Sequence, residues 1–89
     1  MQTFAHIASR TLLIAGHPNS SWSIADDGTP GSFEADFSFE IRDDGRHNYL
    51  LVYSSLDGQF SGDSWHETID EAYASAEQQF GIAREEWLT

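Results

Sequence analysis

The sequence predicts an α+β fold, an antiparallel sheet of four to five strands with one C-terminal amphipathic helix packed on one face. Three observations favour this fold. Apolar and polar residues alternate from Phe33 to Arg42, two Asp-Gly pairs mark hairpin turns, and an amphipathic pattern follows Thr68. One sheet face and one helix stripe can bury each other. The 89 residues suit one domain, so we expect residues 1–89 to form a single small acidic domain.

The first third of the chain gives weaker signals. Residues 1–8 show no clear pattern and leave their structure open. Residues 11–14 predict a short strand, which ends at the Gly-, Pro- and Asn-containing turn signal of residues 16–20. Trp22 and Ile24 alternate with small residues and predict a second short strand, and residues 26–31 predict a loop.

The strongest strand signal covers residues 33–42, where the period is two. Phe33, Ala35, Phe37, Phe39 and Ile41 are expected on the core face, and Glu34, Asp36, Ser38, Glu40 and Arg42 on the solvent face. A two-residue turn at Asp44-Gly45 aligns Phe39 with Leu50, Phe37 with Val52 and Phe33 with Leu56. A three-residue loop instead turns Tyr49, Leu51 and Tyr53 toward the phenylalanines. Residues 49–52 are apolar on both faces, so both registers stay open.

A second hairpin and a helix complete the predicted fold. Asp57-Gly58 predicts a turn into a strand at residues 59–65. Thr68 and Glu71 fit a capping box, and Gly81 suits the left-handed residue that ends a helix. The apolar stripe of this helix comprises Ile69, Ala72, Tyr73, Ala76 and Phe80. We expect residues 83–87 to form a short turn that folds Trp87 back on the core.

Charge and composition exclude several classes of function. Four Lys+Arg, all of them arginine, face fifteen Asp+Glu, for a net charge of −11. Nucleic acids and anionic membranes attract basic surfaces, so we expect neither as a partner, whereas a basic protein suits this charge. The lack of cysteine excludes disulfides, thiolate nucleophiles and Cys-type zinc sites. The N-terminal residues lack a signal-peptide pattern and no stretch is apolar enough to span a membrane, so we expect a cytoplasmic protein.

From Tyr49 onward the chain resembles a group of short acidic bacterial proteins. Their pattern is a Tyr/Leu-rich strand, a Gly-Asp-Ser/Thr-Trp-His stretch and an Ala-rich helix that ends in Phe-Gly. The matching residues here are Gly62-Asp63-Ser64-Trp65-His66, Ala72, Ala76 and Phe80-Gly81, which cover under half of the chain. The group has no assigned activity, so the resemblance implies a bacterial source and a fold, and no function.

The stretch with Asp63, Trp65 and His66 is one candidate site, for a small molecule. His66 is a candidate general base or ligand, and Asp63 is the candidate group that orients it. The alternative, which we favour, makes Trp65 a core residue that fixes the entry of the helix, because a lone histidine near one acid lacks a third catalytic partner. We therefore expect no catalytic residues.

A second candidate site is the acidic strand face with Glu34, Asp36 and Glu40, which we expect beside Tyr49 and Tyr53. Tyrosines provide rigid contact area and carboxylates steer a basic partner, so this set predicts a protein-binding surface. The alternative is a solvated sheet face whose acids only keep the protein soluble.

We expect neither a metal site nor a cofactor. His6, His17, His47 and His66 do not have the spacing of metal ligands, and no Gly-rich phosphate loop is present. The Asp-Asp-Gly stretches at residues 26–28 and 43–45 resemble pieces of calcium loops but are short of ligands.

The leading functional hypothesis is a non-catalytic acidic interaction module that binds a basic protein surface. Its sharpest versions are an immunity- or antidote-type inhibitor of a basic toxin and a mimic of DNA charge. One alternative is a small-molecule binder or minor enzyme that uses the Asp63-Trp65-His66 segment. Another is a structural homodimer or subunit, and the sequence leaves open whether the protein is a monomer or a homodimer.

Overall fold

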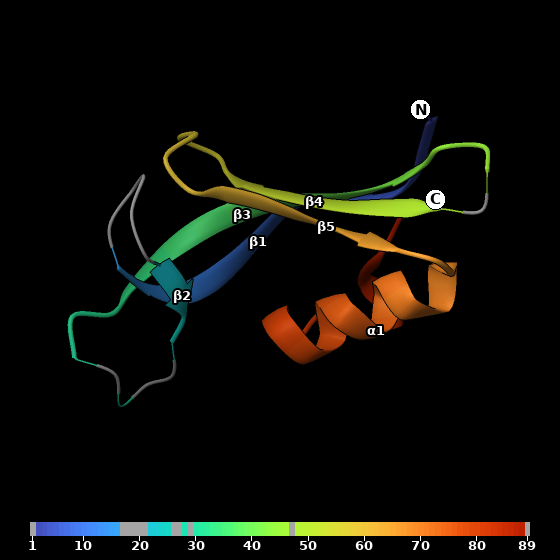
Figure 1. The fold of residues 1–89 in the computed structure, drawn as a ribbon. Helices are drawn as coiled ribbons and strands as arrows, with labels where there is room; N and C mark the ends of the chain where they lie inside the picture. The colour runs from blue at the N-terminus through green and yellow to red at the C-terminus, as the bar shows by residue number, and fades with distance from the viewer. Residues whose placement is uncertain (1, 17–21, 26–27, 29, 47, 89) are drawn as a thin grey trace.

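The computed structural model describes residues 2–16, 22–25, 28, 30–46 and 48–88. Its elements are β1 (Gln2–Gly16), β2 (Trp22–Ile24), β3 (Phe33–Asp43), β4 (Tyr49–Ser55), β5 (Ser61–His66), α1 (Ile69–Phe80) and the short 3₁₀ helix η1 (Arg84–Glu86). The strands form one antiparallel sheet in the order β2-β1-β3-β4-β5, and α1 lies along one face of it (Figure 1). The predicted α+β fold with a C-terminal helix on the sheet is confirmed.

β1 is much longer than the strand predicted at residues 11–14. It pairs with β3 from Gln2 to Ile14, and the register shifts twice, between Thr3 and Ala5 and between Ile7 and Arg10. A bulge adds a residue and changes which residues face the core. Ala5 and Ile7 are therefore buried before the second bulge, and Leu12 and Ile14 after it. This change from odd to even positions breaks the period of two along β1, so the pattern of the chain does not predict one continuous strand.

The register of the β3–β4 hairpin differs from the prediction of a two-residue turn. Phe39 pairs with Tyr53, and Ile41 pairs with Leu51. The two-residue turn is wrong because two aspartates hold a longer loop at residues 44–48. Asp43 Oδ1 accepts the N–H of Gly45 at 2.7 Å, and Asp44 Oδ1 accepts those of Arg46 at 2.7 Å and Asn48 at 3.1 Å. The alternative of a three-residue loop correctly turns Tyr49, Leu51 and Tyr53 toward the phenylalanines. Its loop is too short, because the last pair of the hairpin is Asp43 with Tyr49.

The predicted helix is confirmed at both ends. The Thr68 hydroxyl accepts the N–H of Glu71 at 3.1 Å, and the Glu71 carboxylate accepts the N–H of Glu67, one residue earlier than in a standard capping box. Gly81 ends the helix in the left-handed conformation, with φ of 68°. The last turn, η1, folds Trp87 back on the core, where it is 7% exposed.

The core lies between α1 and the face of the sheet that it covers. Phe37, Phe39, Ile41 and Leu51 are at most 2% exposed there. From α1 the stripe residues Ala72, Ala76 and Phe80 are buried, and Ile69 and Tyr73 pack against them.

Some of the predictions fall outside the described part of the chain. They concern residues 17–20 of the predicted turn, residues 26, 27 and 29 of the predicted loop, and His47. Among the described residues, no helix has the length and apolar character needed to cross a membrane.

Candidate functional site

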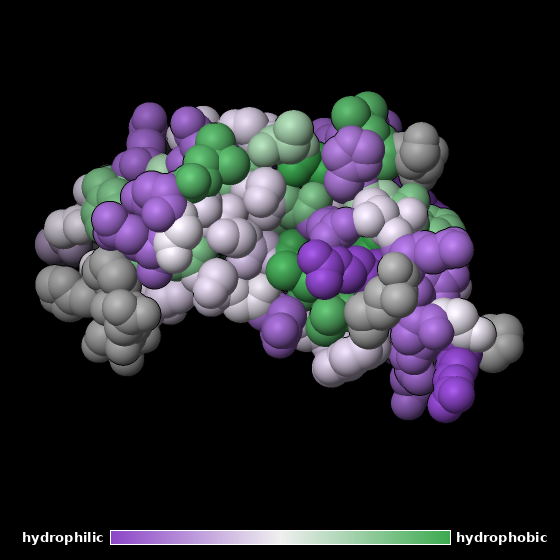
Figure 2. Space-filling view, turned by 90° about the horizontal axis from the view of Figure 1, so that it is seen from above, coloured by the Kyte–Doolittle hydropathy of each residue, from purple (hydrophilic) through white to green (hydrophobic). Residues whose placement is uncertain are grey.

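One face of the sheet is left open. α1 covers the other face, and none of the described segments lies over this one (Figure 1). We call it the outer face; its residues include His6, Thr11, Glu34, Asp36, Ser38, Glu40, Arg42, Leu50, Val52, Ser54, Asp63 and Trp65. Figure 2 looks onto this face and shows hydrophobic and hydrophilic residues interspersed on it. Such a mixed surface differs from the core face, where apolar residues predominate.

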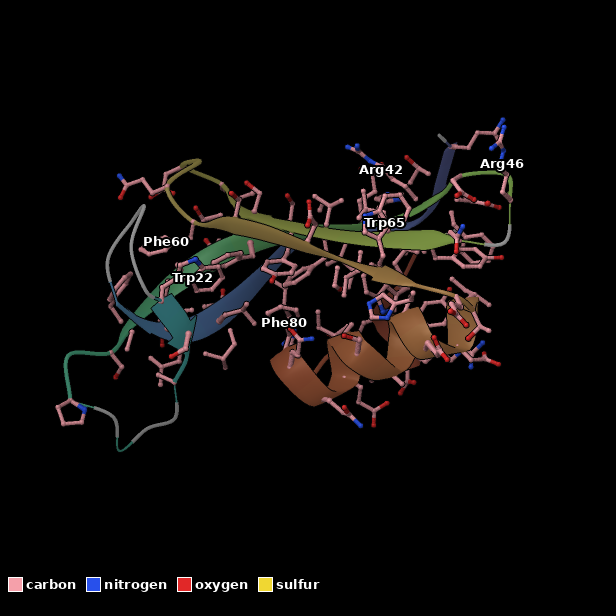
Figure 3. The ribbon with its side chains drawn as sticks, viewed as in Figure 1. Trp22, Arg42, Arg46, Phe60, Trp65 and Phe80 are labelled. Atoms are coloured by element: carbon pink, nitrogen blue, oxygen red, sulfur yellow. The ribbon has the colours of Figure 1, made fainter. Side chains whose placement is uncertain are left out.

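Trp65 lies on the outer face rather than in the core. Within β5 its neighbour Ser64 pairs with Leu51, which is fully buried on the helix-covered face. Alternation along the strand then turns Trp65 outward, and Figure 3 shows it on the side of the sheet opposite α1. Its side chain is 58% exposed and pairs with Leu50 across the strands. The prediction that Trp65 fixes the helix entry as a core residue is wrong.

Trp65 shares the outer face with two carboxylates, one on its own strand and one two strands away, and with Arg42, which pairs with Leu50. Asp63, two residues before Trp65 in β5, shares its face and pairs with Val52, which in turn pairs with Glu40 of β3. A hydrogen bond from the Thr3 hydroxyl lowers the pKa of Glu40, and partial burial opposes this effect. The Arg42 guanidinium, 2.6 Å from the Glu40 carboxylate, lowers the pKa further. Glu40 therefore carries its negative charge at neutral pH.

Glu34 and Asp36 extend the acidic surface along β3. Both lie on the outer face, as the alternation of this strand predicts. Asp36 Oδ1 accepts a hydrogen bond of 2.5 Å from the Thr11 hydroxyl of β1. This bond orients the Asp36 carboxylate along the sheet surface without neutralising it.

The tyrosines are not beside these acids, contrary to the expectation for this candidate site. Tyr49 and Tyr53 lie on the helix-covered face, because their partners across the strands, His66 and Gly62, lie there. The Tyr53 ring packs against Phe80 of α1 at 4.8 Å between centroids. Burial raises the pKa of Tyr53, and the negative charge of Asp63 raises it further. The aromatic residue among the carboxylates is Trp65, and the alternation of residues 61–66 was the signal that could have identified it.

The structure does not bring Asp63, Trp65 and His66 into one site. Asp63 and Trp65 face outward, whereas His66 lies on the opposite face, with Nε2 at 2.8 Å from the Ser64 hydroxyl. Asp63 therefore cannot orient the His66 ring, as proposed from the sequence. Within the described ranges, no group of three or more His, Cys, Asp or Glu side chains is arranged to hold a metal ion.

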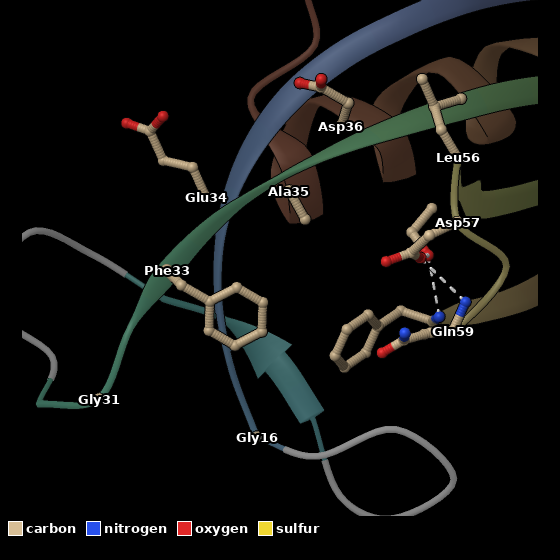
Figure 4. Close-up of a pocket in the computed structure, with 11 residues that line it drawn as sticks. Gly16, Gly31, Phe33, Glu34, Ala35, Asp36, Leu56, Asp57 and Gln59 are labelled. Atoms are coloured by element: carbon tan, nitrogen blue, oxygen red, sulfur yellow. Dashed lines mark hydrogen bonds between the residues drawn. The ribbon is translucent and has the colours of Figure 1, made fainter.

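Two clefts lie near β2 and the start of β3. The first, of about 390 Å³, lies between β2 and the last turn of α1; we call it the aromatic cleft, because Trp22, Tyr53 and Phe80 line it together with Ile24 and three polar residues. The second, of about 670 Å³, lies between the start of β3 and the β4–β5 turn (Figure 4).

The wall of the second cleft is a structured turn. There the Asp57 carboxylate accepts the hydroxyl of Ser55 at 2.6 Å and the N–H of Gln59 at 3.0 Å. The hydrogen bond from the Ser55 hydroxyl has the larger effect in lowering the pKa of Asp57, and the bond from the Gln59 N–H lowers it further. This carboxylate therefore adds a negative charge to the rim of the cleft.

Comparison of the chain with protein-family models, with curated proteins and with solved structures finds no match.

Proposed function

We propose that this protein is a non-catalytic acidic interaction module that binds a basic protein through the outer face of its sheet. The observation that carries the proposal is the exposed Trp65, which pairs with Leu50 and shares the outer face with Asp63 of the same strand and with the acidic residues Glu34, Asp36 and Glu40 of β3. Tryptophan is the residue type most enriched at energetically dominant positions of protein interfaces. The proposal includes the cytoplasmic location and bacterial source that the sequence predicts.

Charge supports a basic partner over an acidic or neutral one. The net charge is −11, and three of the arginines are already engaged in ion pairs within the chain. Arg10 pairs with Glu86, Arg42 with Glu40, and Arg84 with Asp70. An excess of carboxylates produces a field that accelerates association with a basic protein and weakens as salt is added.

Two finer versions of this proposal share the same surface. An immunity- or antidote-type inhibitor would cover the basic site of a toxin, and a mimic of DNA charge would occupy the basic site of a DNA-binding protein. In both versions carboxylates replace phosphates as the negative groups, and Trp65 adds an apolar anchor. The identity of the bound protein distinguishes them.

Capture from a lysate of the source cells tests the proposal. We expect one basic protein to be recovered in stoichiometric amount with the unmodified chain and to elute only at high NaCl concentration. Trp65→Ala should reduce its recovery at least about tenfold, in keeping with the loss of an interface anchor. The matched control is Glu77→Gln on the exposed side of α1, which removes one charge and should leave recovery nearly unchanged. Equal recovery with Trp65→Ala would contradict the proposal.

A second candidate function is the binding of a small apolar molecule in the aromatic cleft. Trp22, Tyr53 and Phe80 line it, and its volume of about 390 Å³ falls within the range of ligand sites. This version places the ligand at Trp22 and not at the Asp63-Trp65-His66 segment. It predicts that a ligand perturbs Trp22 and leaves Trp65 unaffected.

A further inference from the structure

β5 forms one edge of the sheet: within the described part of the chain it pairs only with β4, and its backbone is unpaired on the other side. At the turn between the two strands, the N–H of Ser55 donates to the carbonyl of Phe60 at 2.7 Å. Hydrogen-bonded and non-hydrogen-bonded pairs alternate along an antiparallel ladder. Gly62, Ser64 and His66 therefore direct their N–H and C=O groups to β4. Ser61, Asp63 and Trp65 direct theirs away from the sheet.

The other edges of the sheet are shorter or partly covered, unlike this one. At β1, Leu88 exchanges two backbone hydrogen bonds with His6, at 2.9 and 3.0 Å, and two bulges interrupt the strand. β2 has only three residues. β5 pairs with β4 without a register shift and contains no proline or lysine. Proteins usually protect an edge strand with bulges, prolines, lysines or a covering segment, because an open edge accepts another strand.

The charges around β5 indicate which strand this edge would accept. Ser61, Asp63 and Trp65 carry the exposed side chains of the strand, and the exposed Glu67 follows it. A second copy of this chain would bring another net charge of −11 to the same edge. An extended segment with lysine or arginine at alternate positions would instead place cations beside the Asp63 carboxylate and over the Trp65 ring.

We propose that β5 accepts an extended basic segment of the partner protein as an additional strand of the sheet. The inference rests on the proposed function and specifies how the partner is held. The partner's backbone bonds to Asp63 and Trp65, and the alternate basic side chains of the added strand lie on the outer face. Backbone bonds supply affinity in this mode of recognition, and alternate side chains supply specificity.

Amide hydrogen exchange of the full chain tests strand addition. The probe is an acetylated and amidated peptide, Lys-Val-Arg-Val-Lys-Val-Arg, added to saturation at low salt. In the free protein the amides of Asp63 and Trp65 should exchange fast and that of Ser64 slowly. The peptide should slow exchange at Asp63 and Trp65 at least about tenfold. In an antiparallel added strand, the lysines and arginines lie opposite Asp63 and Trp65 and direct their N–H groups to β5. A peptide with the same side chains and N-methylated lysines and arginines should therefore bind more weakly and give no such protection.

Two substitutions separate the backbone contribution from that of charge. Asp63→Asn removes the carboxylate and keeps the outward N–H, whereas Asp63→Pro removes both and leaves the β4 ladder bonds intact. We expect the proline variant to bind the peptide about fivefold more weakly than the asparagine variant, as expected for one lost hydrogen bond. Circular dichroism checks that each variant is folded. The exchange experiment uses the unmodified chain, so its result does not depend on whether the variants fold.

Two results would overturn the inference. Fast exchange of Asp63 and Trp65 at saturating peptide would overturn strand addition. If the Trp65 indole signal still shifts in that case, binding at the outer face stands and only the strand mode fails. Protection of the two amides in the protein alone, rising with protein concentration, would assign the edge to a second copy of the chain.

Discussion

At the scale of single residues, Ser55 shows how one buried polar group holds a turn. It is 4% exposed, its hydroxyl donates to Asp57 at 2.6 Å, and it accepts the N–H of Phe60 at 3.0 Å. Ser55→Ala leaves that buried N–H without its acceptor and should lower the free energy of unfolding by about 1–3 kcal/mol. Urea denaturation measures the loss. Ser54→Ala, at the neighbouring position on the outer face, is the control, and an equal loss there would contradict the assignment.

The same residue shows what sequence alone can predict at this scale. Asp57-Gly58 marks a turn because few residue types favour those backbone conformations. A serine at the end of a strand carries no comparable signal, so the role of Ser55 could not be predicted. Trp65 was placed on the wrong side for a different reason. A large aromatic residue is usually buried, and here the alternation of β5 takes precedence over that preference.

At the scale of elements, Gly62 allows β5 to lie close to a tyrosine ring. A Cβ added there would lie 2.5 Å from the Tyr53 hydroxyl oxygen and 2.6 Å from two ring carbons. Gly62→Ala should therefore push the ring out of its place against Phe80 and lower the free energy of unfolding by about 1–3 kcal/mol. Ser61→Ala, which is exposed, should change it by less than about 0.5 kcal/mol. Similar stability of the two variants in thermal denaturation would refute this packing.

The elements also differ in how well sequence predicts them. β3 and α1 follow from their patterns, because each has one buried and one exposed face with an uninterrupted period. β1 was recognised only in part, since its bulges interrupt the period. The β3–β4 register depended on a loop whose hydrogen bonds to Asp43 and Asp44 were not apparent from the Asp-Gly pair.

At the scale of the whole molecule, the excess of negative charge should destabilise the fold at low salt. The net charge of −11 is spread over a chain of 89 residues, so repulsion acts over distances that salt screens. We expect Tm to rise between about 10 mM and about 200 mM NaCl, as the Debye length falls. Scanning calorimetry measures the rise, and Glu77→Lys should make it smaller. A Tm that is flat or falls with salt would contradict this account.

The three tryptophans are separate probes of whether a basic protein binds the outer face. Trp65 reports on that face, the half-buried Trp22 on the aromatic cleft and the buried Trp87 on the core. The measurement follows their indole N–H signals in ¹⁵N-labelled protein while the co-purified basic protein is added. We expect the Trp65 signal to shift, the signals of Trp22 and Trp87 to stay in place, and high NaCl concentration to reverse the shift. A shift at Trp22 with no change at Trp65 would contradict binding at the outer face and would assign binding to the cleft.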